Sequence, residues 1–240
     1  MKKEEFISEL QLKAKSINLE LSDKKAELLY EYKNLVIEWN KNINLTAITE
    51  DEEFINKHLI DSLTICKYIE NKEKKIIDIG TGAGFPGIPL KIVLENKVVL
   101  FDSLNKRLKV LDDITEKLNI NNISTLHGRA EETFKNKEYR EKFDIATSRA
   151  VAGLNILAEL MLPAVKVGGK CICMKGNNIE EELNNSKKAI KILGGKIEKV
   201  EKMMLPGTNI ERNIVIILKI KETPKLYPRK PGTPQKQPIV

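Results

Sequence analysis

A cluster of glycines after a short apolar segment is the clearest chemical signal in this sequence. Residues 76–87 read IIDIGTGAGFPG, so Asp78 stands just before Gly80, Gly82 and Gly84. Glycine adopts positive φ angles at little cost and has no Cβ, so the backbone can turn sharply and approach a ligand closely. A buried strand, a glycine-rich turn and a following helix form the nucleotide-binding crevice of open α/β sheets. The segment therefore predicts a nucleotide cofactor site.

Two classes of cofactor compete for this loop, and the neighbouring residues distinguish them. Residues 82–87 match the dinucleotide pattern G-x-G-x-x-G, which is weak evidence unless it opens directly after a strand. Pro86 and Pro89 also remove backbone N–H groups that a pyrophosphate would need. Asp78 would be a poor neighbour for phosphates but suits a cationic ligand with an amino group. The pattern D-x-G-x-G-x-G is typical of class I S-adenosylmethionine-dependent methyltransferases and favours that cofactor.

A second acidic residue is placed to bind a ribose. Residues 97–101 read KVVLF, a mostly apolar run that predicts a strand ending at Asp102, 22 residues after Gly80. In dinucleotide sites an acid about 20 residues past the loop hydrogen-bonds the ribose. Asp102 could equally cap the helix expected from Leu104, and the two roles are compatible. Asp102 therefore supports a nucleoside site without identifying the nucleoside.

The rest of the chain supplies the elements that must position this site. From residue 75 onward, apolar runs alternate with helical patterns, which predicts a mostly parallel sheet covered on both faces. We expect strands near residues 75–79, 97–101, 122–127, 143–148, 169–174, 196–203 and 212–220. We expect helices near residues 86–95, 104–119, 130–136, 152–162 and 178–193. The last two strands follow each other directly and predict a hairpin around residues 205–208. This α/β pattern is that of a class I methyltransferase, a Rossmann-like seven-stranded sheet.

The first 72 residues are expected to form a helical extension of that sheet. Apolar residues recur at helical spacing after Ser22, the expected N-cap. A polar loop at residues 40–46 then leads to a second helix expected over about residues 51–69. We divide the chain into a helical extension at 1–72, a methyltransferase domain at 73–221 and a C-terminal arm at 222–240.

Length and composition exclude several classes of protein. The 240 residues are enough to bury a sizeable core, and they contain no apolar run of about 18 residues. The N-terminus lacks the apolar stretch of a signal peptide. The three cysteines lack metal-binding spacing, and there are only two histidines. We therefore expect a cytoplasmic protein with reduced thiols and no metal site.

Positive charge is concentrated at the C-terminal end of the chain. Of a formal net charge of +7, residues 219–240 carry six bases against one acid, a net charge of +5. Five prolines in the same segment oppose a helix or a central strand. The arm is either a solvated tail or a contact for a polyanion, because clustered Lys and Arg release counterions from a phosphate backbone. We expect it to carry phosphate contacts and little of the core.

Ordered motifs over nearly the whole chain resemble a single protein family. They are the bacterial small-subunit ribosomal RNA guanine-N7 methyltransferases, also called glucose-inhibited division protein B. Only Pro231, where a small residue is expected, departs from the family pattern. The matching segments are WN at 39–40, NLTAI at 44–48, HLIDSL at 58–63, FPGIPL at 85–90, DSLNKR at 102–107, GRAE at 128–131, SRAV at 148–151 and YPRKPGTP at 227–234.

The resemblance implies an enzyme, a cofactor and a substrate. The cofactor is S-adenosyl-L-methionine, and the substrate is 16S rRNA, alone or within the small ribosomal subunit. The family pattern also implies cofactor contacts from Gly80, Phe85, Ala130, Glu131 and Arg149.

Two of those positions also have expected roles from the fold alone. Glu131 follows the third strand, where an acid can meet the edge of an adenine or simply favour a helix N-terminus. Arg149 ends the fourth strand at the carboxyl edge of the sheet, where ligands bind. Its guanidinium could clamp a carboxylate or a phosphate, or serve as a salt-bridge partner.

Polar and basic residues outside the loop supply the remaining candidates. His58 is by default a packed histidine, but with neighbouring polar groups it could help to form a lid over the cofactor. The candidate lid or positioning residues are Asn44, His58, Asp61 and Ser62. Aromatic residues make up only 5% of the chain, so base stacking is not the expected mode of RNA binding. The candidate RNA-binding residues are Lys106, Arg107, Arg129, Lys175, Arg212, Arg229, Lys230 and Lys236.

The expected reaction is in-line transfer of a methyl group from a sulfonium to guanine N7. That nitrogen has a free lone pair in neutral guanine, so no proton must leave and no general base is expected. Two alternatives stay open: a class I methyltransferase acting on a protein or small molecule, and a non-catalytic ribosome-binding factor. The basic arm opposes the first, and the intact glycine loop with Asp78 and Asp102 opposes the second. A monomer is expected.

Overall fold

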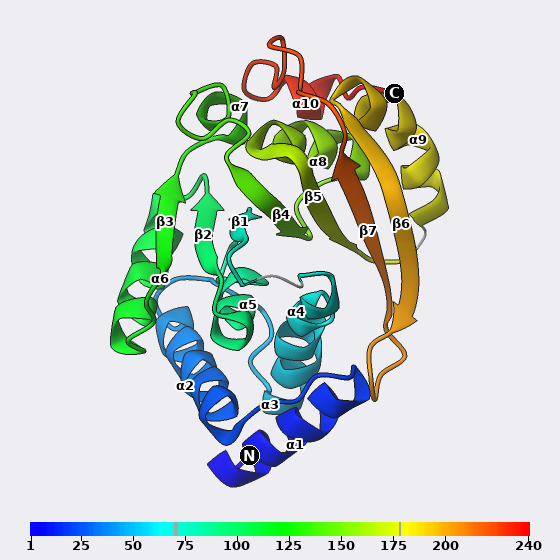
Figure 1. Cartoon of the computed structure of the whole chain (residues 1–240). Helices are drawn as coiled ribbons and strands as arrows, with labels where there is room; N and C mark the ends of the chain where they lie inside the picture. The colour runs from blue at the N-terminus through cyan, green and yellow to red at the C-terminus, as the bar shows by residue number, and fades with distance from the viewer. Residues whose placement is uncertain (70–71, 178) are drawn as a thin grey trace.

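Seven strands form one mixed sheet in the order β3-β2-β1-β4-β5-β7-β6 (Figure 1). The computed structural model describes residues 1–69, 72–177 and 179–240. Residues 70 and 71 of the expected extension, and residue 178 at the start of an expected helix, lie outside the described residues. The strands are β1 (Lys75–Ile79), β2 (Lys97–Asp102), β3 (Ile123–His127), β4 (Phe143–Arg149), β5 (Val165–Lys175), β6 (Gly195–Met204) and β7 (Glu211–Lys219). All seven expected strands are confirmed.

Strand pairing brings the candidate site residues to one edge of the sheet. β1 pairs in parallel with both β2 and β4, and β2 pairs in parallel with β3. The carboxyl ends of these strands therefore meet at one edge, where open α/β sheets bind ligands. β7 lies antiparallel between β5 and β6, so the expected closing hairpin is confirmed.

Helices cover both faces of the sheet and divide the core in two. Ile76 and Ile77, which are successive residues of β1, belong to opposite core clusters, as the two-residue period of a strand requires. Figure 1 shows α8 and α9 over one face and α5 with the N-terminal helices under the other. The helices that follow the first strand are α5 (Gly87–Leu94), α6 (Asn105–Lys117), α7 (Ala130–Thr133), α8 (Leu154–Met161) and α9 (Ile179–Ile192).

The helical extension is confirmed, but the helix expected over residues 51–69 is not regular. α1 (Lys3–Ser16) and α2 (Asp23–Asn40) precede it, and Ser22 caps α2 by accepting from the Lys25 amide at 3.4 Å. The expected continuous helix is divided into α3 (Asp51–Phe54), a π-helix (Ile55–Ile60), α4 (Asp61–Leu63) and a 3-10 helix (Cys66–Tyr68). π-Helical turns inside helices occur frequently at functional sites.

The C-terminal arm packs against the domain, so the expectation that it contributes little to the core is wrong. Pro228 and Pro234 are buried, and α10 (Thr233–Lys236) forms one helical turn despite the prolines. Arg140 donates to the Tyr227 and Thr223 carbonyls at 2.8 and 2.6 Å. Buried Lys219 of β7 donates to Thr223 Oγ1 of the arm. Composition alone gave no sign of these contacts, because a docked and a solvated basic arm have similar sequences.

The three cysteines, Cys66, Cys171 and Cys173, are free and buried in the structure. Burial raises the pKa of the Cys66 and Cys173 thiols to about 12. In the part of the chain that the structure describes, no group of three or more His, Cys, Asp or Glu side chains could hold a metal ion. No helix there has the length and apolarity needed to cross a membrane.

Candidate cofactor and acceptor sites

Asp78 shapes the glycine loop from inside the protein. Its Oδ2 accepts from Thr81 Oγ1 at 2.7 Å and from the Gly87 amide at 2.9 Å, and its Oδ1 accepts from Thr147 Oγ1 at 3.2 Å. Burial raises the pKa of Asp78 to about 6, against the opposing effect of these hydrogen bonds. The side chain is fully buried, so the expected contact with a ligand ammonium is not available to it in this structure. Asp78 instead braces the loop between β1 and α5.

Two glycines of the loop have positive φ angles, and an added side chain would meet different surroundings at each. Gly80 has φ +73°, and a Cβ there would lie 2.5 Å from Cγ2 of Val151. Gly82 has φ +59°, and a Cβ there would meet no atom within 4 Å, so this face of the loop is open. The Gly82 amide donates to Asp102 Oδ2 at 3.0 Å. The loop is thus fixed to the end of the neighbouring strand.

Asp102 accepts hydrogen bonds from two backbone amides, and its expected contact with a ribose stays a prediction. Its Oδ2 holds the loop, and its Oδ1 accepts from the Leu104 amide at 2.9 Å, next to the start of α6. Each carboxylate oxygen has a second lone pair, so the group can still accept from ribose hydroxyls. Asp102 also lines a cleft at the carboxyl ends of β1 and β2.

That cleft has the surroundings of a nucleoside site. Its volume is about 140 Å³, and Val151, which packs over Gly80, closes one side of it. The loop backbone, an acid for a ribose and apolar walls for a base all face it, so the residues present fit the nucleoside part of S-adenosylmethionine. The cleft is lined by Ile79, Gly80, Phe101, Asp102, Ser103, Gly128, Arg129, Ala130, Glu131, Val151 and Leu160.

We expect Asp102→Ala to weaken S-adenosylmethionine binding by about 1.5–3 kcal/mol, the usual worth of hydrogen bonds to a charged group. Isothermal titration calorimetry measures this affinity, and thermal unfolding measures the loss of the helix and loop contacts. Asp102→Asn is the matched variant, because it retains the size of the side chain and one acceptor oxygen. If Asp102→Ala lowers thermal stability but binds the cofactor as tightly as wild type, Asp102 serves the fold alone.

Arg149 turns away from this cleft and toward the helical extension. Its guanidinium donates to the Lys57 carbonyl at 2.8 Å, to Asp61 Oδ2 at 3.1 Å and to His58 Nδ1 at 3.0 Å. It also lies over the Phe85 ring, 5.0 Å from the centroid. Of the roles expected for Arg149, the structure shows the salt bridge.

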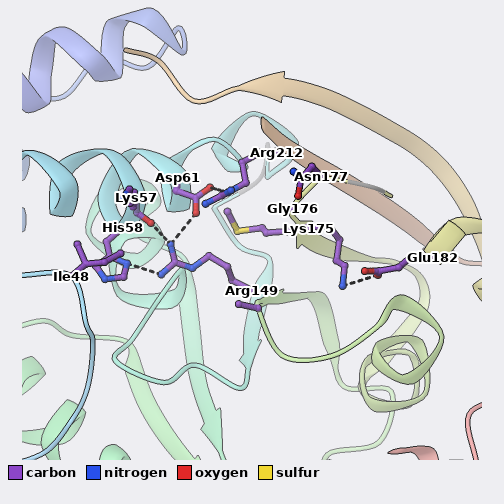
Figure 2. A pocket seen from close by; sticks show the side chains of 12 residues that line it. Ile48, Lys57, His58, Asp61, Arg149, Lys175, Gly176, Asn177, Glu182 and Arg212 are labelled. Atoms are coloured by element: carbon purple, nitrogen blue, oxygen red, sulfur yellow. Dashed lines mark hydrogen bonds and ion pairs between the residues drawn. The ribbon is translucent and has the colours of Figure 1, made fainter. Parts of the chain in front are cut away.

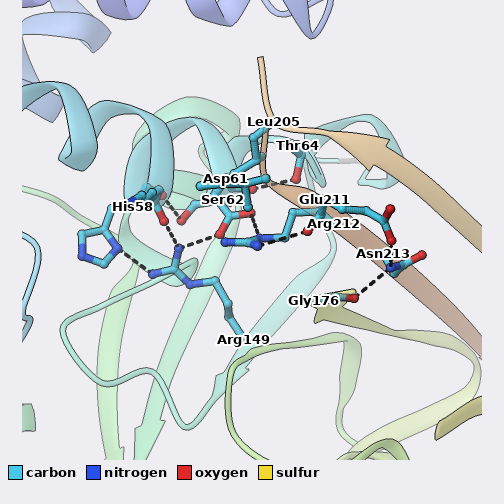
Figure 3. A network of polar contacts seen from close by, with 12 residues as sticks. His58, Asp61, Ser62, Thr64, Arg149, Gly176, Leu205, Glu211, Arg212 and Asn213 are labelled. Carbon is cyan, nitrogen blue, oxygen red and sulfur yellow. Dashed lines mark hydrogen bonds and ion pairs between the residues drawn. The ribbon is translucent and has the colours of Figure 1, made fainter. Parts of the chain in front are cut away.

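Asp61 joins two arginines that are far apart in the sequence. Its Oδ1 accepts from Arg212 Nε of β7 at 3.1 Å, while its Oδ2 accepts from Arg149 of β4 (Figure 3). The Asp61 side chain is only 2% exposed, against 14% for Arg149 and 25% for Arg212. The buried carboxylate therefore sets the positions of both guanidinium groups.

His58 is a packed, neutral histidine. Its ring stacks on Phe85 with centroids 4.3 Å apart and an angle of 9° between the planes. Burial, with the nearby Arg149 charge, lowers the pKa of His58 to about 3. Because Nδ1 accepts from Arg149, the proton of the neutral ring belongs on Nε2, which lies 2.7 Å from Thr46 Oγ1. Both ring nitrogens are thus occupied.

A second cavity of about 540 Å³ opens on the other side of Arg149 (Figure 2). Four cationic side chains border it, and Figure 2 shows Lys175 reaching Glu182 across from the Asp61 cluster. Arg149 and Ala150 line this cavity, and the adjacent Val151 lines the nucleoside cleft. The segment 149–151 therefore separates the two spaces. The lining residues are Ile48, Lys57, His58, Asp61, Arg149, Ala150, Met174, Lys175, Gly176, Asn177, Glu182 and Arg212.

Two candidate positioning residues lie outside this arrangement. Asn44 is exposed and lines neither space. Ser62 is fully buried and donates to the His58 carbonyl in its own helix at 2.5 Å, so a role as a lid is wrong for it. His58 and Asp61 are the two of the four candidates that the structure brings to the cavity.

The basic candidates divide into exposed and paired residues. Arg229 pairs with buried Glu159 at 2.7 Å and lines neither space, so its expected role in RNA binding stays a prediction without support from the geometry. Lys175 and Arg212 are also paired, with Glu182 at 2.7 Å and Asp61 at 3.1 Å, but both border the cavity. Lys106, Arg129, Lys230 and Lys236 are exposed, and Arg107 is half-buried.

Several residues of the site were not expected from the sequence. Tyr32 of α2 donates to the Ala83 carbonyl at 2.6 Å, so the helical extension supports the glycine loop directly. Val151 lines the nucleoside cleft, and Lys57 lines the larger cavity beside Arg149. Val151 lies in the segment SRAV that carries the family resemblance, which was the available signal for it. Tyr32 had no such signal, because its helical spacing is that of an ordinary core residue.

Comparison with known proteins agrees with this geometry. The family model GidB, rRNA small subunit methyltransferase G, matches residues 25–215. A protein named ribosomal RNA small subunit methyltransferase G from Clostridium novyi is 53% identical over 98% of both chains. One of the same name from Acetivibrio thermocellus is 52% identical over 94% of this chain and 93% of its own.

Among solved structures, M. jannaschii TYW2 in complex with AdoMet has a TM-score of 0.54 at 15% identity, over 68% of this chain and 76% of that one. At this identity the likeness shows a shared fold alone. The sequence relatives are far closer and match almost end to end. This chain belongs to the GidB family, the rRNA small subunit methyltransferase G proteins.

Proposed function

We propose that this chain transfers a methyl group from S-adenosylmethionine to N7 of a guanine in 16S rRNA of the small ribosomal subunit. The observation that carries the proposal is the placement of two spaces on either side of residues 149–151. One is the nucleoside cleft beside the glycine loop, and the other is the cavity bordered by cations. Family membership supports the same reaction. The enzyme acts in the cytoplasm as a monomer.

The residues of the cleft divide the cofactor between them. Asp102 holds the ribose, the backbone at Gly80 and Gly82 admits the chain of the ligand, and Ala130 with Glu131 meets the adenine. When bound there, S-adenosylmethionine supplies a methyl group activated by a positively charged sulfur. Phe85 is buried under His58 and Arg149, so it supports the wall between the two spaces.

The cation-bordered cavity takes the acceptor nucleotide. Lys57, Lys175, Arg149 and Arg212 attract RNA phosphates, and arginine can bind them with two parallel hydrogen bonds. N7 of a stacked guanine is reached only when the RNA exposes or flips the base. Because neutral guanine needs to lose no proton, these residues accelerate transfer by holding the base in line with the methyl group. Such alignment is worth up to ~7–11 kcal/mol.

We expect His58 to contribute no general-base step to the reaction. Its pKa of about 3 keeps the ring neutral across the working pH range, and its Nδ1 lone pair is occupied by Arg149. In single turnover with saturating RNA and cofactor, the rate should show no rise near pH 6.5 in wild type. His58→Ala should lower the rate, since Arg149 loses a partner, but keep the shape of the pH profile. A rise in wild type that disappears in His58→Ala would show a general base and contradict N7 as the acceptor.

Binding and transfer experiments test the proposed function together. Titration calorimetry should show that the purified chain binds S-adenosylmethionine. With isotopically labelled cofactor, the label should enter 16S rRNA, supplied either as naked RNA or within small subunits. Label in ribosomal protein, or absence of cofactor binding, would contradict the proposal.

A further inference from the structure

The C-terminal segment is fixed to the domain by a buried ion pair. Arg229 donates to Glu159 of α8 through Nε at 2.9 Å and Nη2 at 2.7 Å, and its backbone amide donates to the same carboxylate at 2.8 Å. The Glu159 side chain is only 1% exposed. Such two-pronged pairs impose geometry as well as binding energy. The position of the chain at Arg229 is therefore fixed relative to α8.

Three residues further on, the same segment holds a side chain of the nucleoside cleft. The Gly232 amide donates to Glu131 Oε1 at 3.0 Å. Gly232 has φ +78°, a conformation that glycine adopts readily and that turns its amide toward α7. Of the two Glu131 oxygens, Oε1 is engaged by this bond. The segment thus orients the Glu131 carboxylate.

The two anchors belong to two helices that each contribute a residue to the lining of the cleft. Glu131 belongs to α7, and Glu159 precedes Leu160 of α8, which lines the cleft. Figure 1 shows α10 next to α8, with the rest of the C-terminal segment near α7. Residues 229–232 therefore link α8 to α7 through the hydrogen bonds of Arg229 and Gly232.

The fold has separate anchors for the start of the segment. Arg140 donates to the carbonyls of Thr223 and Tyr227, and Lys219 pairs with Glu141 at 3.0 Å. These contacts lie upstream of Arg229 and hold the chain to the domain without it. Loss of the Arg229–Glu159 pair is therefore a local change that the domain can survive.

We propose that residues 229–232 are a strap that sets the cofactor cleft, with Arg229 and Gly232 as positioning residues for cofactor binding. The inference rests on the proposed function, since it takes the cleft to be the S-adenosylmethionine site. The strap acts through Glu131 and not through contact with RNA. This role differs from that of a phosphate-contacting arm, and RNA-free binding measurements distinguish the two.

The test compares single variants of the full chain by titration calorimetry with S-adenosylmethionine, without RNA and well below the unfolding temperature. Arg229→Met should weaken binding about tenfold, within the usual range of coupling between contacting groups. Arg229→Lys should recover part of the loss. Lys225→Met removes the same charge from an exposed position in the same segment and should bind like wild type. Wild-type affinity in folded Arg229→Met would overturn the inference.

A double-mutant cycle shows whether Arg229 acts through Glu131. In a Glu131→Gln background, Arg229→Met should have a much smaller effect than in wild type, because the side chain it positions has already changed. Equal effects in both backgrounds would overturn the inference. Failure of wild type to bind the cofactor would instead contradict the proposed function.

A measurement on the unaltered protein covers the case in which Arg229→Met does not fold. Linkage between the strap and the site is reciprocal, so cofactor binding should stabilise the strap. Amide hydrogen exchange across residues 229–236 should slow when S-adenosylmethionine is added, while exchange across β6 at the far edge of the sheet should not change. Unchanged exchange in residues 229–236 under saturating cofactor would overturn the inference.

Discussion

Gly82→Val is expected to abolish S-adenosylmethionine binding while the chain remains folded. Gly82 has φ +59°, and an added side chain would enter the open space on the ligand side of the loop. A β-branched residue also strains this conformation, by about 1–2 kcal/mol on the general cost for L-residues. That strain is small against the roughly 5–15 kcal/mol of a domain's stability, so the fold should survive. Because the Gly82 amide holds Asp102, any shift of the loop also moves the ribose acid.

Gly168→Val is the matched control for backbone strain. Gly168 has φ +86° and open space around an added Cβ, but it lies in the first half of β5, away from the nucleoside cleft. Both variants should lose a similar amount of thermal stability, and only Gly82→Val should lose the cofactor. Calorimetric titration at matched protein concentration measures the difference. A folded Gly82→Val variant with wild-type affinity would mean that the cofactor binds elsewhere.

Asp61→Leu is expected to reduce both stability and RNA methylation strongly. The substitution leaves Arg149 and Arg212 without the carboxylate that lies between them. Removing one partner of a buried ion pair generally costs about 3–5 kcal/mol. Since both arginines retain some exposure, we expect the lower end, about 3 kcal/mol in urea unfolding. Cofactor affinity should change little, because Asp61 does not line the nucleoside cleft.

Asp144→Leu serves as the control for loss of a paired carboxylate. Asp144 pairs with Lys166 at 2.6 Å and lies close to Lys74, but at the amino-terminal end of β4. Asp144→Leu should lower the stability of the protein without changing the rate of methyl transfer by the folded protein. If Asp61→Leu also leaves that rate unchanged in single turnover, the cavity beside Arg149 is not the acceptor site.

The sequence was enough to predict the site residues that stand at the ends of strands. Asp78, Asp102 and Arg149 each stand at or near the end of a predicted strand, and parallel pairing brings such ends to one edge. Local periodicity is therefore enough to place them in one region. The alternation of elements predicted a mostly parallel sheet, and the final pair of strands without a helix between them predicted the closing hairpin.

Long-range side-chain pairs could not be predicted in this way. Asp61 meets Arg212 across 151 positions of sequence, and Gly232 meets Glu131 across 101. Nothing in local composition distinguishes a paired arginine from one that faces solvent. For the same reason Arg229 was expected on the RNA-binding surface, whereas it is held by a buried glutamate. The π-helix at residues 55–60 was also hidden, because its apolar pattern resembles that of an ordinary helix.

The most direct test of the account is mass spectrometry of the nucleosides of 16S rRNA. Small subunits from a strain that lacks this protein would be incubated with the purified chain and S-adenosylmethionine, and the RNA would then be digested to nucleosides. We expect wild type to increase 7-methylguanosine by one residue per subunit and Gly82→Val to leave it unchanged. A methyl group on another atom or another base, or no new methylated nucleoside with a chain that binds the cofactor, would contradict the account.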